Sequence, residues 1–324
     1  GLARSVNAAT RYVLQRIGQA AIVLQIAFTA AFLLLQALPG DAIMIKFENP
    51  ELGLSPAQIA EVRERFGVDT ALPVQFVHTL LGFLAGDFGY SIQTGTAVRQ
   101  LLAEALPNTL ILGALALLVA TALAAGIAFL SSVPRFGWIR DALRALPPLI
   151  VSLPTFWLGI MLIQLVSFQL GWVRVINPGP IEALVLPVIT LALPLSAPLA
   201  QILIRSIDDV AAAPFIAVVR AKGASPAWIL SRNIAKNAML PTLTMAGIIL
   251  GDLIGGAVLT ETVFARPGIG RIAEQSVSFQ DTPVLLAVVV LTTTAFVTVN
   301  LVVDLLYPVF DPRLASRLKT GVHA

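Results

Sequence analysis

The sequence lacks cysteine entirely, so neither a disulfide nor a thiolate metal site can form within its 324 residues. Charge is also scarce, because 12% of the residues are charged whereas 57% are hydrophobic. In soluble domains about a quarter of the residues are charged. Together with a mean hydropathy of +0.88, this shortage of charge predicts a polytopic membrane protein.

Long runs without charge bound the membrane spans, because a helix that crosses ~30 Å of hydrocarbon needs roughly 20 apolar residues. Five runs qualify, and a sixth, from Asn237 to Thr260, is long enough but contains Asp252. We therefore expect an all-α integral membrane protein with six transmembrane helices, at residues 17–38, 107–130, 146–173, 183–204, 238–260 and 282–303. Prolines in the third and fourth of these helices favour kinks: Pro147, Pro148, Pro154, Pro187, Pro194 and Pro198.

The distribution of lysine and arginine among the segments between spans predicts how these helices are oriented in the membrane. If residues 1–16 are cytoplasmic, the segments on that side also include the link before the third helix, residues 206–236 and residues 304–324, and together they carry 14 of the 21 basic residues. The positive-inside rule then places both termini in the cytoplasm. The net charge of +3 follows from this topology, so we do not interpret it as a sign of nucleic-acid binding.

The segment at residues 39–106 is too long for a simple turn and predicts a small helical extracytoplasmic subdomain. Ser55 and Gln58 form a capping box with Pro56 at the first helical position, and Gly67 ends the helix. A second apolar stretch, residues 77–84, ends at Gly86.

The most informative charged stretch, residues 206–236, lies between two apolar runs, and we call it the elbow. A helix through Arg220 is expected to stop at Gly223, with Ser225 as the N-cap and Pro226 at the first position of a second helix. Two short helices joined at a glycine suit a surface on which another protein docks.

Motifs that mark enzymes are missing. No Gly-x-x-x-x-Gly-Lys-Ser/Thr loop occurs, and none of the four lysines follows a glycine, so we expect no phosphate-binding loop of this kind. The two histidines, His78 and His323, fall on opposite sides of the membrane in this topology. We therefore expect a chain that is not an enzyme and that binds no metal or cofactor of its own.

A series of short motifs follows in order along the chain. They are LPGD at 38–41, GDFGYS at 86–91, LPNTL at 106–110, PTFWLG at 154–159, RAKG at 220–223, ETVF at 261–264, PGIG at 267–270, NLVVDLLY at 300–307 and DPR at 311–313. In this order they resemble the permease subunits of bacterial ATP-binding-cassette importers for dipeptides, oligopeptides and nickel. The resemblance is to the first of the two permeases of such a system.

The resemblance implies a multi-pass protein of the bacterial cytoplasmic membrane, embedded in lipid, that imports peptides. It implies a second homologous permease, two cytoplasmic ATPase subunits that bind ATP and Mg²⁺, and an extracytoplasmic substrate-binding protein. Nickel or another small solute is the alternative cargo. Peptides are favoured because no span contains histidine or cysteine.

The resemblance also implies that the elbow contains the coupling helix that docks in a groove of the ATPase. The residues that map to it are Arg220, Lys222, Gly223, Ala224, Ser225 and Pro226. Three preceding residues depart from the family's more polar pattern: Ala217, Val218 and Val219. For these three, an apolar face that simply packs on neighbouring spans is the alternative.

Asp252 lies within the fifth span, where an unpaired charge costs at least ~2.5 kcal/mol. We favour a position lining the translocation path, with Gly255 and Gly256 beside it; a structural bond to another helix or to the paired permease is the alternative. For Asp304, at the end of the last span, a structural role is expected. A secondary transporter that uses Asp252 as an ion site, and a purely structural membrane subunit, are the competing functions.

Overall fold

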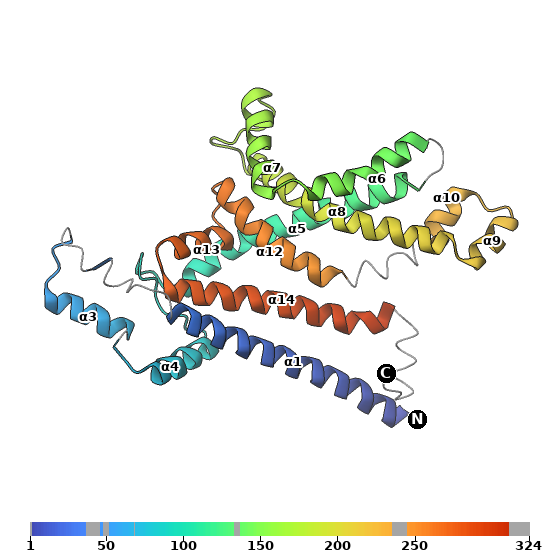
Figure 1. The fold of residues 1–324 in the computed structure, drawn as a ribbon. Coiled ribbons are helices and arrows are strands. Elements are labelled where there is room, and N and C mark those ends of the chain that lie inside the picture. The colour runs from blue at the N-terminus through green and yellow to red at the C-terminus, as the bar shows by residue number, and fades with distance from the viewer. Residues whose placement is uncertain are drawn as a thin grey trace. The chain divides into compact units, whose positions relative to one another are not determined.

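The structure is a computed structural model, and it describes residues 2–36, 46–47, 52–67, 69–132, 137–234 and 245–310. Helices dominate these residues, which contain no named strand, and the expected helical fold is confirmed (Figure 1). The helices are α1 (Leu2–Gln36), α3 (Pro56–Phe66), α4 (Leu72–Ala85), α5 (Val98–Leu130), α6 (Gly137–Val151), α7 (Thr155–Leu162), the π-helix η2 (Ile163–Gln169), α8 (Glu182–Ala211), α9 (Pro214–Ala221), α10 (Pro226–Ile229), the π-helix η3 (Leu230–Ile234), α12 (Ala246–Val263), α13 (Ile269–Ser278) and α14 (Thr282–Phe310).

Four stretches are long and apolar enough to cross a membrane: Val13–Gln36, Val98–Leu130, Glu182–Ala211 and Thr282–Asp304. A fifth candidate is the pair formed by α6 and α7 with η2, which is bent by 105°. α12 has 18 residues and follows residues 235–244, which lie outside the described part of the chain. The described residues thus support a multi-pass membrane protein with four or five candidate spans.

The prolines act differently in the two helices where kinks were expected. Pro154 is the N-cap of α7, at the break where the chain turns by 105° after α6. α8 instead continues as one helix through its three prolines. Neighbouring helices surround this part of α8, since 61% of its most apolar stretch is buried. Membrane helices tolerate proline where such neighbours can bond the freed carbonyl groups.

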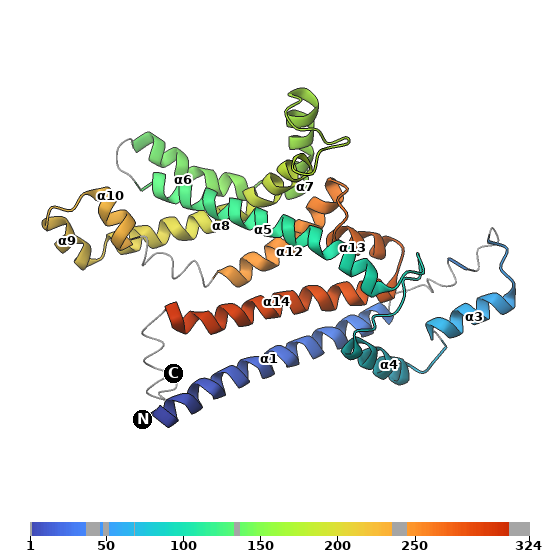
Figure 2. The ribbon, with the colours of Figure 1, turned by 180° about the vertical axis from the view of Figure 1, so that it is seen from behind.

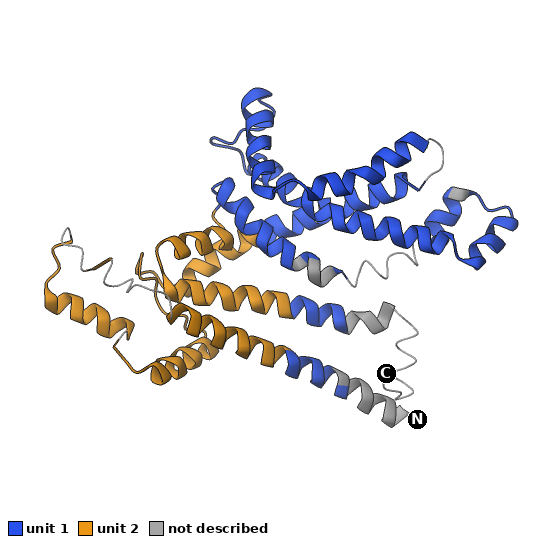
Figure 3. Cartoon of the chain, viewed as in Figure 1, with its two compact units in different colours: residues 1–19, 110–266, 298–324 blue, residues 20–109, 267–297 orange. Residues whose placement is uncertain are grey.

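The chain forms two compact units, coloured separately in Figure 3. Unit 1 comprises residues 1–19, 110–266 and 298–324, and its centre is α8, on which α6, α7 and α12 pack (Figures 1 and 2). α5 contributes small residues to the core of this unit: Ala116, Ala120 and Ala124 are fully buried in one cluster with Leu191 and Leu195 of α8.

Unit 2 comprises residues 20–109 and 267–297. One of its cores joins α5, α13 and α14 through Val98, Ile269 and Val284. A second core joins α1, α4 and α14 and is rich in phenylalanine. The capping box of Ser55 and Gln58 is present at the start of α3, so the local prediction for this segment is confirmed.

Candidate functional site

The elbow has the local structure that its sequence predicts. α9 begins with Pro214 and ends next to Gly223, which has a φ of +84°. This left-handed conformation favours glycine because a Cβ would strain the backbone there. After it, the Ser225 hydroxyl accepts a hydrogen bond from the Trp228 amide at 3.3 Å and caps the short helix α10. The helix, glycine, serine and proline signals are thus confirmed.

One face of the elbow is fixed to the rest of unit 1. Ile216 of α9 and Ile229 at the end of α10 are 1% and 3% exposed, and they pack with Ile207 of α8 and Ala128 of α5. The last turn of α8 therefore continues into the elbow through an apolar core. A displacement of the elbow would be transmitted to α8 and α5, because packed cores do not deform continuously.

The opposite face of the elbow is open in the described part of the chain. Phe215, Val218 and Trp228 are 47%, 56% and 48% exposed. Val219 instead packs on the apolar core of the elbow. The sequence left open whether Ala217, Val218 and Val219 simply pack on neighbouring helices; Val219 does so and Val218 does not. The basic residues Arg220 and Lys222 are exposed beside these apolar side chains. The surface thus combines apolar anchors with positive charge.

The three candidate path residues of α12 do not share one environment. Asp252 and Gly255 are exposed, and a Cβ at Gly255 would meet nothing within 4 Å. Gly256 faces α8, where a Cβ would lie 2.6 Å from Cδ1 of the buried Leu191. Gly256 is therefore a close-packing position, whereas Asp252 and Gly255, one helical turn apart, lie on the open side of α12.

Two of the sequence motifs meet in unit 1, at the ends of α7 and α12. A Cβ on Gly159 would lie 3.2 Å from both Thr190 of α8 and Val263 of α12. Gly159 thus lets PTFWLG and ETVF pack closely. Beyond them, the Arg266 guanidinium donates from Nη1 to the Ala183 carbonyl oxygen at 2.9 Å. Burial lowers the pKa of Arg266, and the Glu261 carboxylate opposes this effect.

Two further motifs meet in unit 2. Asn108 of LPNTL donates from Nδ2 to the Pro267 carbonyl oxygen at 2.7 Å, and the Thr109 hydroxyl accepts from the Ile269 amide at 2.8 Å. These bonds hold the PGIG segment at the start of α13. The bonded residues are about 160 positions apart in the sequence, so no local pattern predicts that they meet.

Asp281 is a buried residue that no motif in the sequence indicated. It is 3% exposed, and its carboxylate accepts hydrogen bonds from the Ser91 hydroxyl and from the amides of Ile92 and Gln93. The end of GDFGYS is thereby tied to the start of α14. Lys46 binds the Ile92 and Gln93 carbonyl oxygens, and burial lowers its pKa while Asp281 opposes this. In the sequence, the position of Asp281 directly before Thr282 and Pro283, where a span begins, is the feature that could have pointed to this role.

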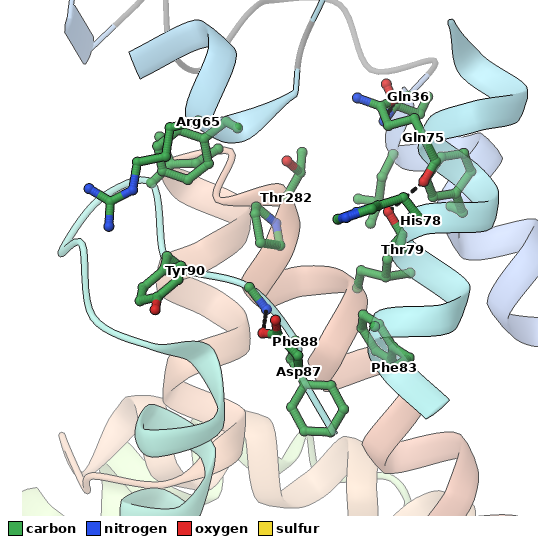
Figure 4. A pocket seen from close by; sticks show the side chains of 18 of the residues that line it. Gln36, Arg65, Gln75, His78, Thr79, Phe83, Asp87, Phe88, Tyr90 and Thr282 are labelled. Atoms are coloured by element: carbon green, nitrogen blue, oxygen red, sulfur yellow. Dashed lines mark hydrogen bonds between the residues drawn. The ribbon is translucent and has the colours of Figure 1, made fainter. Parts of the chain in front are cut away.

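Unit 2 also contains a pocket of about 410 Å³ near the end of α1. Figure 4 shows His78 and Thr79 of α4 on one side of it and Arg65 and Tyr90 on the other. The Arg65 guanidinium lies over the Tyr90 ring at 5.2 Å from its centroid. The lining of the pocket combines aromatic side chains, such as Phe32 and Phe83, with polar ones, such as Gln75 and His78.

Asp304 pairs with Arg16, whose Nη1 lies 3.2 Å from Oδ2 of the carboxylate. The expected structural role of Asp304 is consistent with this ion pair between α1 and α14. Both residues belong to unit 1.

Comparison with known proteins decides the family. Residues 119–316 match the family described as "Binding-protein-dependent transport system inner membrane component", and residues 9–113 match its N-terminal family. The chain belongs to this family. The resemblance inferred from the motifs is thereby confirmed. The family description makes the chain a transport subunit rather than a catalytic one. Its candidate spans make it a multi-pass membrane protein.

Curated relatives match over nearly their whole length. The "Probable peptide ABC transporter permease protein y4tP" of Sinorhizobium fredii is 35% identical, with 94% of this chain and 98% of the relative covered. The "Glutathione transport system permease protein GsiC" of Salmonella typhimurium is 34% identical and that of Escherichia coli (strain K12) 33%, each with the same coverage.

Two solved transporters share the fold of this inner membrane component. An inward-facing MetNI methionine ABC transporter has a TM-score of 0.56 at 18% identity, covering 65% of this chain and 97% of that chain. An amino acid ABC transporter with histidines has a TM-score of 0.52 at 22% identity, covering 64% and 93%. At these identities the similarity is one of fold.

Proposed function

We propose that this chain is the first permease subunit of an ATP-binding-cassette importer that moves di- or oligopeptides into the bacterial cytoplasm. The observation that carries the proposal is family membership along almost the whole chain. Relatives described as peptide and glutathione permeases support the choice of cargo. Nickel or another small solute is the alternative cargo within the same family.

The complex would contain a second homologous permease, two ATPase subunits that bind ATP and Mg²⁺, and a substrate-binding protein outside. Six spans at the predicted positions, with both termini in the cytoplasm, fit this arrangement. The third span would include the bent α6 and α7, and the fifth would include α12. Residues 39–106 would then form the extracytoplasmic subdomain.

In this proposal the elbow is the contact with an ATPase subunit. Its open face offers Phe215, Val218 and Trp228 beside Arg220 and Lys222, a combination of apolar anchors and charge that is common at protein interfaces. Its other face is packed on α8 and α5. Closure of the ATPases would shift the elbow as a rigid body and rock these helices, opening the path to the outside.

Asp252 and Gly255 would face the path or the second permease. The open side of α12 is the side on which a second subunit would complete a lumen. Gly256 would contribute by letting α12 approach α8 closely rather than by lining the path.

Site-specific cross-linking tests the proposed docking surface. Because the chain contains no cysteine, Val218→Cys or Trp228→Cys introduces a single thiol on the open face of the elbow. Phe279→Cys, at a residue of unit 2 that is 59% exposed, is the matched control. The proposal expects both elbow variants, and not the control, to cross-link to an ATPase subunit in the assembled complex. Equal labelling of all three, or none, would move the docking surface elsewhere.

A further inference from the structure

The short apolar helix α4 follows the end of the membrane-spanning part of α1. α4 has 14 residues, too few to cross a bilayer, and His78 is its only titratable residue. The Gln36 side chain, at the last residue of the α1 span, donates to Oε1 of Gln75 at 2.9 Å. The first turn of α4 therefore lies beside the end of that span.

From this point α4 runs back along α1. The rings of Phe28 and Phe83 are 5.3 Å apart between centroids, and those of Phe32 and Phe76 are also 5.3 Å apart. Phe28 is eight residues before Gln36, and Phe83 is eight residues after Gln75. At 1.5 Å per residue the two helices run antiparallel for about 12 Å. The last turn of α4 therefore lies beside a part of α1 that is well inside the span.

Helical spacing divides α4 into three faces. The face on α1 consists of Phe76, Leu80 and Phe83. The face on the pocket consists of Gln75, His78, Thr79 and Gly82. The third face consists of Val74, Val77, Leu81 and Leu84, which are 61%, 52%, 60% and 77% exposed. The members of this third face follow one another at intervals of three, four and three residues, so they form one continuous stripe.

We propose that α4 is seated in the lipid at the end of α1, with this stripe, residues 74, 77, 81 and 84, in contact with acyl chains. Over the same part of its span, α1 also exposes apolar side chains, since Ile26, Leu33 and Leu34 are 62%, 49% and 69% exposed. No side chain of the stripe is polar, and among the described residues none covers it. Because the last turn of α4 lies beside a part of α1 that is inside the span, the exposed Leu81 and Leu84 are at the depth of acyl chains.

The capping glycine fits this placement. Gly86 has a φ of +78° and its amide bonds back to the Phe83 carbonyl, so the helix ends sharply after Ala85. The chain then turns back through Asp87 to Ser91, which is held by Asp281 at the start of α14. α4 thus enters and leaves on the same side of the membrane. In the proposed orientation this is the extracytoplasmic leaflet, but contact with lipid does not depend on that orientation.

Depth-dependent fluorescence quenching tests the lipid contact without any measurement of transport. Single cysteines at Leu81 and Leu84 would carry an environment-sensitive dye in the full-length chain, within the assembled complex in liposomes whose other subunits lack accessible cysteine. His78→Cys, on the pocket face of the same helix, is the matched control. Leu81, Leu84 and His78 are exposed, so these three variants leave the core against α1 intact. A scan over residues 73–84, restricted to variants that assemble, adds an internal check.

We expect dye at Leu81 and Leu84 to lose emission with brominated lipids and to resist aqueous iodide, with the opposite result at His78. The scan should give lipid-quenching maxima at residues 74, 77, 81 and 84. Quenching of the stripe by iodide alone would show that it faces water and overturn the proposal. Protection from both quenchers would show a protein partner on the stripe and overturn it as well.

Discussion

Arg144 of α6 and Asp208 of α8 form a two-bonded ion pair, in which Nη1 and Nη2 of the guanidinium each lie 2.9 Å from one carboxylate oxygen. Asp208 lies in the last turn of α8, among the first residues of the elbow. The pair therefore ties α6 to the point where the elbow joins the spans.

We expect Arg144→Ala or Asp208→Ala to lower the thermal stability of the complex. The side chains are 34% and 49% exposed. The contribution should be about 1 kcal/mol, the upper end for partly exposed pairs, because the geometry is bidentate. The double exchange Arg144→Asp with Asp208→Arg should recover most of the loss in a melting experiment. An exchange no more stable than either single variant would show that the pair contributes little.

Replacing Gly223 with valine should uncouple ATP turnover from transport. The φ of +84° is strained for a β-branched residue, at about 1 kcal/mol or more, although a Cβ would meet nothing within 4 Å. The expected result is a several-fold fall in substrate-stimulated ATP hydrolysis in a complex that still assembles. Gly223→Asn is the control, since asparagine tolerates this conformation and should retain most of the activity. Wild-type turnover in Gly223→Val would place coupling elsewhere.

Gly255 and Gly256 are adjacent and should respond oppositely to alanine. At Gly256 the new methyl group would meet Leu191 at 2.6 Å, and such overpacking costs about 1–3 kcal/mol. At Gly255 the methyl group enters open space and helix propensity improves. Thermal melting of the two complexes should separate them. The double variant Gly256→Ala with Leu191→Ala should lose less stability than the two single variants together, because the added methyl group occupies space that the leucine leaves. Equal stability of the two glycine-to-alanine variants would contradict the close packing of α12 on α8.

Local signals predicted much of this structure. The capping box at Ser55, the stop at Gly67 and the turn at Gly223 depend on residues within a few positions of each other, so they are readable from sequence. The size of the 105° bend after α6 was not predictable, because Pro154 permits a break in the helix without fixing its angle.

Long-range pairing lay beyond the sequence. The start of α5 also differs from the sequence prediction: the apolar run indicated residues 107–130, whereas the helix begins at Val98 and passes through Pro107. Arg144 and Asp208 are 64 residues apart, and Ser91 and Asp281 are 190 apart. Such pairs depend on how helices pack, and single-sequence periodicity does not report it.

Asp252→Asn separates the two interpretations of this residue. If Asp252 lines an aqueous path, the loss of its charge should change the uptake rate or the preference among charged peptides and leave the melting temperature unchanged. If it bonds to the second permease, melting should fall, and Asp252→Leu should lower it further because a partner is left unpaired. Path lining is excluded if both variants melt early while charge preference stays constant.

ATP-dependent uptake tests the central claim most directly. Liposomes containing the full complex would hold ATP on the side of the ATPase subunits, with the substrate-binding protein and a labelled dipeptide outside. We expect uptake that requires ATP and the binding protein and that continues when the pH gradient is dissipated. Uptake that proceeds without ATP, and collapses with the pH gradient or in Asp252→Asn, would contradict the claim and indicate a secondary transporter.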